Sequence, residues 1–315
     1  MMGLTPRRFR GEEDAPKIKE FLKGRRYWDA LPDYWNTGKS TYAIYLIISS
    51  SAPSNSIVWE DENGQVQAYT WLSFEENHRI GGQSRSWRIL IHADHNRGTV
   101  AEDMLLHAEY QLAAQALSGD NDPLKTVAYE TDDGLLSLIR AHGYVQEDHL
   151  DVYMRQSLDR EIPEPEVVDG YVVRELRREG EIGQRAGAQS ESFGGPADPD
   201  ERSVDEVTQK MRWNEGTEDI DLVAVSSSGT VASYAACSID PVTKLGEFDP
   251  VGTRPAHRRR GLSRAVMLTG LRYMKDKGMA HAVVRTDFDN YPAIRLYESV
   301  GFEVVDNLYR YIKKI

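Results

Sequence analysis

The chain has 315 residues, of which 40% are hydrophobic, and its formal net charge at pH 7 is -12. A chain of this length has room for two domains of ordinary size, each with its own core. The negative charge argues against general nucleic-acid binding, which needs a positive surface to release counterions. We therefore expect a folded acidic protein without a nucleic-acid partner.

Neither a membrane span nor a secretion signal is evident in the sequence. No apolar run reaches the roughly eighteen residues of a span, and the N-terminal MMGLTPRRFRGEED lacks a signal-peptide core. The single cysteine, Cys237, excludes an internal disulfide, and its apolar surroundings favour a core residue over a nucleophile. The histidines show no metal-ligand spacing. We expect a cytoplasmic protein with no metal and no membrane partner.

In chain order, the first half begins with a predicted strand and helix in residues 7–22. Two predicted strands joined by a turn at 62–64 follow. The dipeptide Arg97-Gly98 then precedes a predicted helix, whose apolar residues recur with helical period. The half closes with Gly143-Tyr144 and a final strand. This order of elements is typical of one αβ domain.

The stretch DREIPEPEVVDG, residues 159–170, contains two prolines and five acids, a composition typical of a linker. Beyond it the same order of elements returns, with a turn at Ser228-Gly229, an Arg260-Gly261 step and a closing Gly301-Phe302. We interpret this as an internal duplication; a chance sharing of a common strand-helix order is the alternative. The predicted division is a domain of residues 1–158, the linker, and a domain of residues 171–315.

One segment of the second half predicts a ligand. An apolar strand leads into Arg258-Arg259-Arg260-Gly261-Leu262-Ser263, and an amphipathic helix follows. The unpaired N–H groups and the positive dipole end of a first helical turn hold a diphosphate well, and a glycine allows its close approach. Neither a P-loop nor a dinucleotide pattern is present. A nucleic-acid patch is the alternative for the three arginines, and the position before a glycine and a helix favours phosphate.

Two motifs in this order resemble those of the GNAT acetyltransferases. Arg258-x-x-Gly261-x-Ser263 resembles the R-x-x-G-x-G/A loop that holds coenzyme A diphosphate, and Asn290-x-x-Ala293-x-x-x-Tyr297-x-x-x-Gly301-Phe302 resembles the second signature. The resemblance implies an α/β fold of two tandem GNAT-like domains, as in mycothiol synthase-like acetyltransferases. Each would be a mixed, mostly antiparallel twisted sheet flanked by helices, with a splayed central strand pair.

The resemblance also implies a reaction, in which acetyl-CoA as co-substrate gives its acetyl group to a primary amine of a small molecule by direct attack on the thioester. Tyr297 would protonate the departing thiolate, and Glu247 would draw the amine proton through water. The implied cofactor-binding residues are Val251, Gly252, Thr253, Arg258, Arg259, Arg260, Gly261, Leu262, Ser263, Asn290 and Ala293.

The residues themselves support some of these roles. Pro250 and Pro255 bracket Val251-Gly252-Thr253, and because proline cannot donate to a sheet ladder, we expect a bulge or unpaired edge there. Free backbone groups at such an edge can bond the pantetheine arm. Ser263 replaces the usual Gly or Ala, and its hydroxyl is expected to cap the helix or touch phosphate.

Both catalytic assignments have structural alternatives. For Tyr297 the alternative is a packed core tyrosine, and the intact motif favours catalysis. For Glu247 the alternative is a structural role, and only the resemblance favours catalysis. On a regular strand Asp249 faces the same side.

The first half lacks the chemistry of the second. When Gly143-Tyr144 is placed over Gly301-Phe302, Ile139 stands at the position of Tyr297, and Asp132 and Leu135 at those of Asn290 and Ala293. Aligning the Arg-Gly steps places His95 at the position of Arg258 and Val100 at that of Ser263, and Asp94 beside them would repel a diphosphate. We expect a degenerate copy that supports the fold and shapes the acceptor pocket together with residues 194–216.

Two other functions stay open at this point: a non-catalytic protein that binds or senses acyl-CoA, and a nucleic-acid adaptor that uses the arginine cluster. The oligomeric state is expected to be a monomer or a homodimer.

Overall fold

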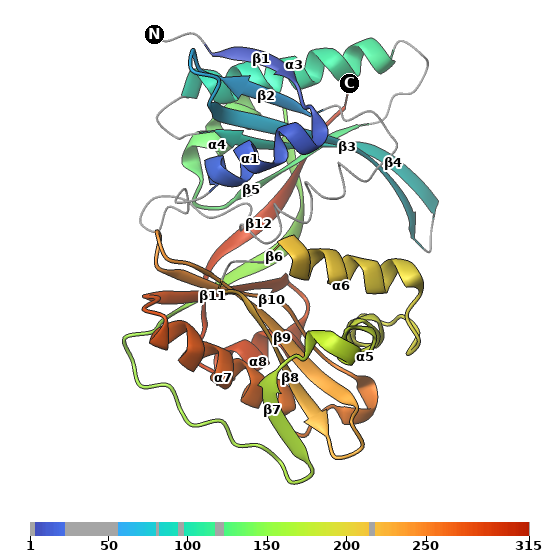
Figure 1. Ribbon diagram of the computed structural model, residues 1–315. Helices are drawn as coiled ribbons and strands as arrows, with labels where there is room; N and C mark the ends of the chain where they lie inside the picture. Colours follow the sequence, from blue (N-terminus) through green and yellow to red (C-terminus); the bar gives the residue numbers. More distant parts are fainter. Residues whose placement is uncertain are drawn as a thin grey trace. The chain divides into compact units, whose positions relative to one another are not determined.

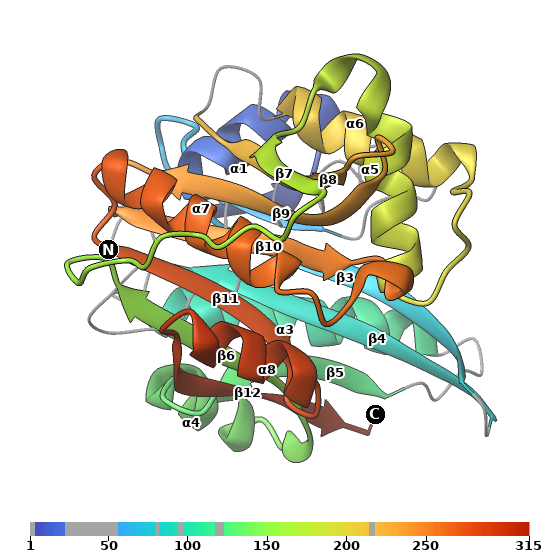
Figure 2. The same cartoon turned by 90° about the horizontal axis from the view of Figure 1, so that it is seen from below.

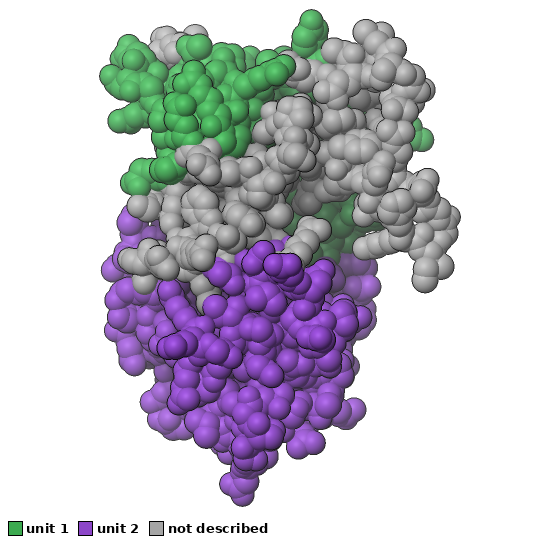
Figure 3. Space-filling view, turned by 45° about the vertical axis from the view of Figure 1, so that its right-hand side comes forward, with its two compact units in different colours: residues 1–151, 306–315 green, residues 152–305 purple. Residues whose placement is uncertain are grey.

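The computed structural model describes residues 4–22, 56–79, 82–93, 98–116, 123–213 and 218–314. The chain packs as two compact units: unit 1, residues 1–151 with 306–315, and unit 2, residues 152–305 (Figure 3). The boundary between these units differs from the linker predicted at residues 159–170. Residues 152–158 lie in unit 2, and residues 306–315 lie in unit 1. Among the described helices, none is both long and apolar enough to cross a bilayer.

The sheet of unit 1 is mostly antiparallel. Its strands, in spatial order, are β1 (Thr5–Arg8), β2 (Ile57–Glu60), β3 (Val66–Arg79), β4 (Gly82–Ala93), β5 (Leu124–Tyr129) and β12 (Glu303–Lys313). The pair β4 and β5 is parallel, and its register covers only Trp87 with Leu124 and Arg88 with Lys125. The central pair of this sheet therefore separates after a short contact, as a splayed pair does.

Helices cover the sheet of unit 1 (Figure 1). They are α1 (Ala15–Leu22), which follows the 3-10 turn η1 (Gly11–Glu13), α3 (Gly98–Ala116) and α4 (Asp133–Ala141). Leu105 and Ala108 of α3 and Leu136 and Ile139 of α4 pack with Tyr311 of β12 in one buried cluster. The apolar stripe of each helix is buried against the sheet, which is the usual source of helix stability in a protein.

The sheet of unit 2 has the same plan. Its strands, in spatial order, are β7 (Tyr171–Glu175), β8 (Ile220–Ser226), β9 (Val231–Asp240), β10 (Leu245–Thr253), β11 (His281–Asp287) and β6 (Val145–Ser157), of which residues 152–157 belong to this unit. The strands β7 to β10 are antiparallel neighbours, and β10 and β11 are parallel.

The helices of unit 2 cover both faces of its sheet (Figure 2). They are α5 (Arg178–Ser192), α6 (Glu201–Trp213), α7 (Leu262–Asp276), which follows the 3-10 turn η2 (Pro255–His257), and α8 (Tyr291–Ser299). On β9, Cys237 lies close to Gly270 of α7, whereas Tyr234 bonds Ser192 of α5. Residues three apart on a strand face opposite sides, so α5 and α7 pack on opposite faces.

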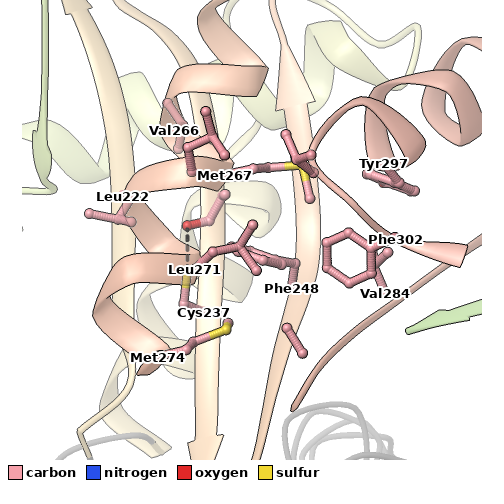
Figure 4. Close-up of a cluster of buried hydrophobic side chains, with 14 of the residues drawn as sticks. Leu222, Cys237, Phe248, Val266, Met267, Leu271, Met274, Val284, Tyr297 and Phe302 are labelled. Atoms are coloured by element: carbon pink, nitrogen blue, oxygen red, sulfur yellow. Dashed lines mark hydrogen bonds between the residues drawn. The ribbon is translucent and has the colours of Figure 1, made fainter. Parts of the chain in front are cut away.

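The core of unit 2 lies between α7, α8 and the sheet (Figure 4). Phe248 of β10 packs edge-on against Phe302, with ring centroids 6.3 Å apart, and fills the space beside Gly270 of α7. Cys237 is 2% exposed in this cluster, and burial raises the pKa of its thiol well above the usual range. The prediction that Cys237 is a core residue fits this environment.

The two units repeat one design but exchange their last strands. In the sequence, β6 follows α4 of the first half and β12 follows α8 of the second. In the sheets, β12 pairs with β5 of unit 1, and β6 stands beside β11. The caps also repeat, because Asp132 accepts from Leu135 N at the start of α4 and Asn290 from Ala293 N at the start of α8. The predicted fold class, two tandem α/β units with mixed sheets, is confirmed.

Candidate active site

The strand β10 has a break in its pairing in the middle of unit 2. Leu245 to Phe248 pair in parallel with His281 to Val284 of β11, and the register to β9 shifts between Phe248 and Val251, where the Asp249-Pro250 peptide is cis. Val251 to Thr253 continue to pair with β9. The bulge expected from the prolines is present, and the described pairing leaves the β11 side of residues 249–253 open.

Gly252 lies where a side chain does not fit. A Cβ atom there would stand 2.4 Å from the Tyr234 hydroxyl and 2.5 Å from Ser192 Oγ, and these two atoms bond each other at 2.8 Å. The backbone of β10 is therefore close to a fixed polar pair on the α5 face. Val251 is partly buried and packs against the core.

Gly252→Ala is expected to lower the free energy of unfolding by about 1–3 kcal/mol, because the methyl group forces Tyr234 and Ser192 apart. Chemical denaturation measures the change. The matched control is Gly183→Ala on α5, where a Cβ meets no atom within 4 Å and helix propensity predicts a gain of up to about 1 kcal/mol. Equal stability of the two variants would show that Gly252 is not close-packed.

Residues 258–263, here named the anion loop, join β10 to α7. Arg259 and Gly261 both have left-handed backbones, with φ of 61° and 75°. Gly261 is the N-cap of α7 without a side-chain cap, and the first helical bond runs from Ala265 N to Gly261 O at 3.0 Å. The N–H groups of residues 262–264 precede that bond and have no helical partner. Together with the left-handed turns they form a concave set of donors suited to an anion.

The three arginines of the anion loop are exposed but differently held. Arg258 donates from Nε to Thr253 O and from Nη2 to Ser192 O, both at 3.2 Å. Arg260 donates from Nη1 to the Tyr171 hydroxyl at 3.3 Å. Fixed guanidinium groups of this kind add positive charge beside the donors at a low cost in side-chain entropy.

Leu262 and Ser263 were both predicted to bind the cofactor, but their side chains contact other residues of the protein. Leu262 is 2% exposed in the core of unit 2. Ser263 Oγ bonds Thr253 Oγ1 at 2.5 Å, and Ser233 Oγ bonds Thr253 Oγ1 at 2.8 Å. The predicted cap by the Ser263 hydroxyl is wrong, because this hydroxyl joins α7 to β10 and β9 and Gly261 caps the helix. The N–H groups of both residues still belong to the set of donors.

Tyr297 lies in the core of unit 2. Its ring is 5% exposed and packs edge-on against Phe302, with centroids 6.2 Å apart (Figure 4). The hydroxyl bonds none of the described residues. Burial, and next the negative charge of Asp249, raise the pKa of this phenol. The group therefore keeps its proton over the whole physiological range.

Asn290 and Ala293 support α8 directly. The Asn290 amide accepts from Ala293 N and donates from Nδ2 to Thr286 Oγ1 at 3.0 Å, and Asn290 is exposed. Ala293 is partly buried against the core. Both residues thus fix the start of the helix that carries Tyr297.

Glu247 lies on β10 just before the bulge and is 2% exposed. Its neighbours Gly246 and Phe248 contact α7, so Glu247 faces the α5 side, as Tyr234 does. The expectation that Asp249 shares this side rested on a regular strand, and the register shift after Phe248 removes that basis.

A buried polar network that the sequence analysis missed supports the site from the α5 side. Arg185 donates from Nε to Asp221 at 2.9 Å, and its guanidinium carbon lies 3.7 Å from the centre of the Tyr234 ring. Arg254, at the end of β10, pairs with Glu191 and donates to Val231 O at 2.8 Å. No short sequence motif links these residues, because their partners lie tens of residues away.

Several predicted features can be compared with the structure only in part. Asp94, His95 and Arg97 lie outside the described residues, as do residues 214–216 of the segment expected to line the acceptor pocket. In the described ranges no three His, Cys, Asp or Glu side chains are placed to hold a metal ion.

Comparisons with known proteins agree with this geometry. Residues 189–302 match the Acetyltransferase (GNAT) family. The chain is 27% identical over 289 residues to a mycothiol acetyltransferase of Nocardiopsis dassonvillei, covering 83% of both chains. It is 24% identical to a mycothiol acetyltransferase of Saccharopolyspora erythraea, covering 79% of this chain and 82% of the relative.

Solved structures show the same fold. A tandem GNAT protein from the clavulanic acid biosynthesis pathway aligns with a TM-score of 0.67 at 16% identity, covering 99% of this chain and 98% of the other. A GCN5-related N-acetyltransferase from Sphaerobacter thermophilus aligns with a TM-score of 0.57 at 19% identity, covering 99% and 95%. The anion loop and Tyr297 lie inside the matched segment, and the chain is an acetyltransferase whose tandem fold is similar to that of the GNAT proteins.

Proposed function

We propose that this acetyltransferase uses acetyl-CoA and transfers the acetyl group to a primary amine of a small molecule. The observation that carries the proposal is the anion loop, where left-handed residues at 259 and 261 precede a first turn of α7 without a side-chain cap. Acyl-CoA is the acyl donor whose diphosphate matches such a donor set. The relatives named mycothiol acetyltransferase support a small-molecule acceptor.

The proposed reaction is a direct transfer. The amine nitrogen attacks the thioester carbonyl, the C–S bond breaks, and the thiolate takes a proton from Tyr297, whose raised pKa keeps that proton available. Glu247 receives the amine proton through water. The open side of residues 251–253 offers backbone groups to the pantetheine amides.

The proposal also covers the acceptor, the partners, the cellular location and the oligomeric state. The acceptor is a small amine, with neither nucleic acid nor membrane as a partner, and the enzyme acts in the cytoplasm as a monomer or homodimer. Unit 1 carries Ile139 at the position of Tyr297, buried in its own core, and serves as a non-catalytic copy.

Acetyl-CoA is expected to raise the melting temperature by several degrees, because a ligand at 100 times its Kd adds about 2.7 kcal/mol of stability. Thiol release with a panel of small primary amines then tests turnover. Gly261→Ala, at φ 75°, is expected to weaken the ligand-induced shift.

The matched control for that variant is Gly278→Ala at the other end of α7. Its φ is 77°, and a Cβ meets no atom within 4 Å at either glycine, so both variants carry the same backbone strain of about 1 kcal/mol. An equal ligand-induced shift in the two variants would contradict binding at the anion loop. Absence of any shift in the wild type would contradict the acetyl-CoA assignment.

A further inference from the structure

Three side chains from two distant parts of unit 2 meet at the anion loop. The Tyr171 hydroxyl, on the edge strand β7, lies 2.8 Å from His257 Nδ1. The two rings meet edge to face, with centroids 5.8 Å apart. Arg260 Nη1 donates to the same hydroxyl at 3.3 Å. One phenol oxygen thus joins the residue just before the anion loop to a residue inside it.

The Arg260 guanidinium can only donate, so the Tyr171 oxygen accepts from it. In the His257 tautomer that has no proton on Nδ1, this nitrogen accepts the Tyr171 proton. This arrangement needs a neutral imidazole. Burial, followed by the positive charges of Arg260 and Arg254, lowers the pKa of His257, and Glu191 opposes them, so the imidazole is neutral at pH 7.

The opposite side of the anion loop is fixed independently. Arg258 is bonded to the carbonyls of Thr253 and Ser192, and Ser263 to the Thr253 hydroxyl. Arg260 has no such anchor among the described residues apart from Tyr171. An exposed arginine loses considerable rotamer entropy when it is fixed on a ligand, and a partner that fixes it beforehand removes part of that cost.

We propose that Tyr171 is a positioning residue of the donor site: its hydroxyl holds Arg260 and His257 against β7, so that the anion loop is preorganised for the diphosphate of acyl-CoA. This inference rests on the proposed function. Tyr171 itself contacts the anion loop from outside and acts through Arg260. The edge strand β7 follows the segment predicted as a linker, and through Tyr171 it contributes to the affinity for acyl-CoA.

The test is the Kd of coenzyme A for the full chain, measured by isothermal titration calorimetry. Tyr171→Phe keeps the ring and removes the hydroxyl, and it is expected to raise the Kd about 5- to 10-fold, the effect of losing one hydrogen bond of ordinary strength. The matched control is Tyr273→Phe on α7, whose hydroxyl donates to Glu218 O at 2.6 Å, and it is expected to leave the Kd unchanged.

A double-mutant cycle separates positioning from general structural support. Because Tyr171 acts through Arg260, Tyr171→Phe is expected to change the Kd less than 2-fold when Arg260→Gln is already present. If Tyr171→Phe raises the Kd by the same factor with and without Arg260→Gln, the proposal is overturned. If Tyr171→Phe does not fold, Arg260→Gln alone is expected to raise the Kd to a similar extent, and an unchanged Kd there overturns it.

The outcomes distinguish this inference from the function on which it rests. Wild-type protein that binds coenzyme A, together with a Tyr171→Phe variant of equal Kd, overturns the positioning role alone. Wild-type protein that does not bind coenzyme A overturns the proposed donor and this inference together.

Discussion

Tyr297→Phe is expected to lower kcat by about 10²-fold or more, since a positioned general acid contributes about 10² to 10⁴ in rate. The KM for acetyl-CoA should stay nearly constant, because the change removes one oxygen and leaves the packed ring in place. Stability should change little, since this hydroxyl bonds none of the described residues. Steady-state kinetics with a turned-over amine and a thermal melt measure both effects.

The pH profile gives a second check on Tyr297. Its pKa is raised above the ordinary 10.0, so the neutral, proton-donating form persists as the pH rises. The wild-type kcat should therefore show no loss from phenol ionisation below about pH 10. Tyr273→Phe serves as the control variant. A Tyr297→Phe enzyme that keeps the full rate with every acceptor would contradict the role of general acid.

A fragment of residues 159–315 is expected to fail to fold, although it contains the whole predicted second domain. It lacks the part of β6 that belongs to unit 2, with Val152 and Met154, and also the following Leu158; each of the three is at most 6% exposed in the core. Burial of such side chains contributes about 1.5–3 kcal/mol each. Their loss therefore approaches the total stability of about 5–15 kcal/mol of an ordinary domain. Circular dichroism during urea denaturation should show no cooperative transition.

The control fragment is residues 145–305. It contains all of β6 and unit 2 and omits the part of β12 that pairs with β5. This fragment is expected to unfold cooperatively and to be stabilised by acetyl-CoA. Cooperative folding of residues 159–315 would contradict the importance of the exchanged strand, as would failure of the longer fragment.

Local features of the site could be predicted from the sequence because each depends on neighbouring residues. The Arg260-Gly261 pair before an amphipathic segment predicted the start of α7, and the pair Pro250 and Pro255 predicted a bulge or unpaired edge in β10. The two spaced motifs predicted the similarity to the GNAT family that residues 189–302 show. In each case a backbone rule acts within a few positions, so the signal is present in a short window of sequence.

Features that depend on distant partners could not be predicted in this way. The hydroxyl of Ser263 bonds Thr253 and approaches Ser233 of β9, and Tyr171 reaches the anion loop from a strand almost ninety residues earlier. The exchange of β6 and β12 also could not be recognised in the sequence. Both strands follow a helix and a glycine-aromatic pair, so their sequence contexts are the same. Local patterns specify a strand, and only tertiary pairing selects its neighbour.

The pairing of β12 with β5 has a consequence for synthesis on the ribosome. Translation proceeds from the N-terminus and domains generally fold as they emerge, yet β5 acquires its neighbour only after residues 308–313 have been made. Until then the nascent first half exposes an unpaired strand edge, which is a site for unwanted association. Newly made chains thus pass through an aggregation-prone interval that ends when the final segment docks, and chaperones would shorten their exposure during it.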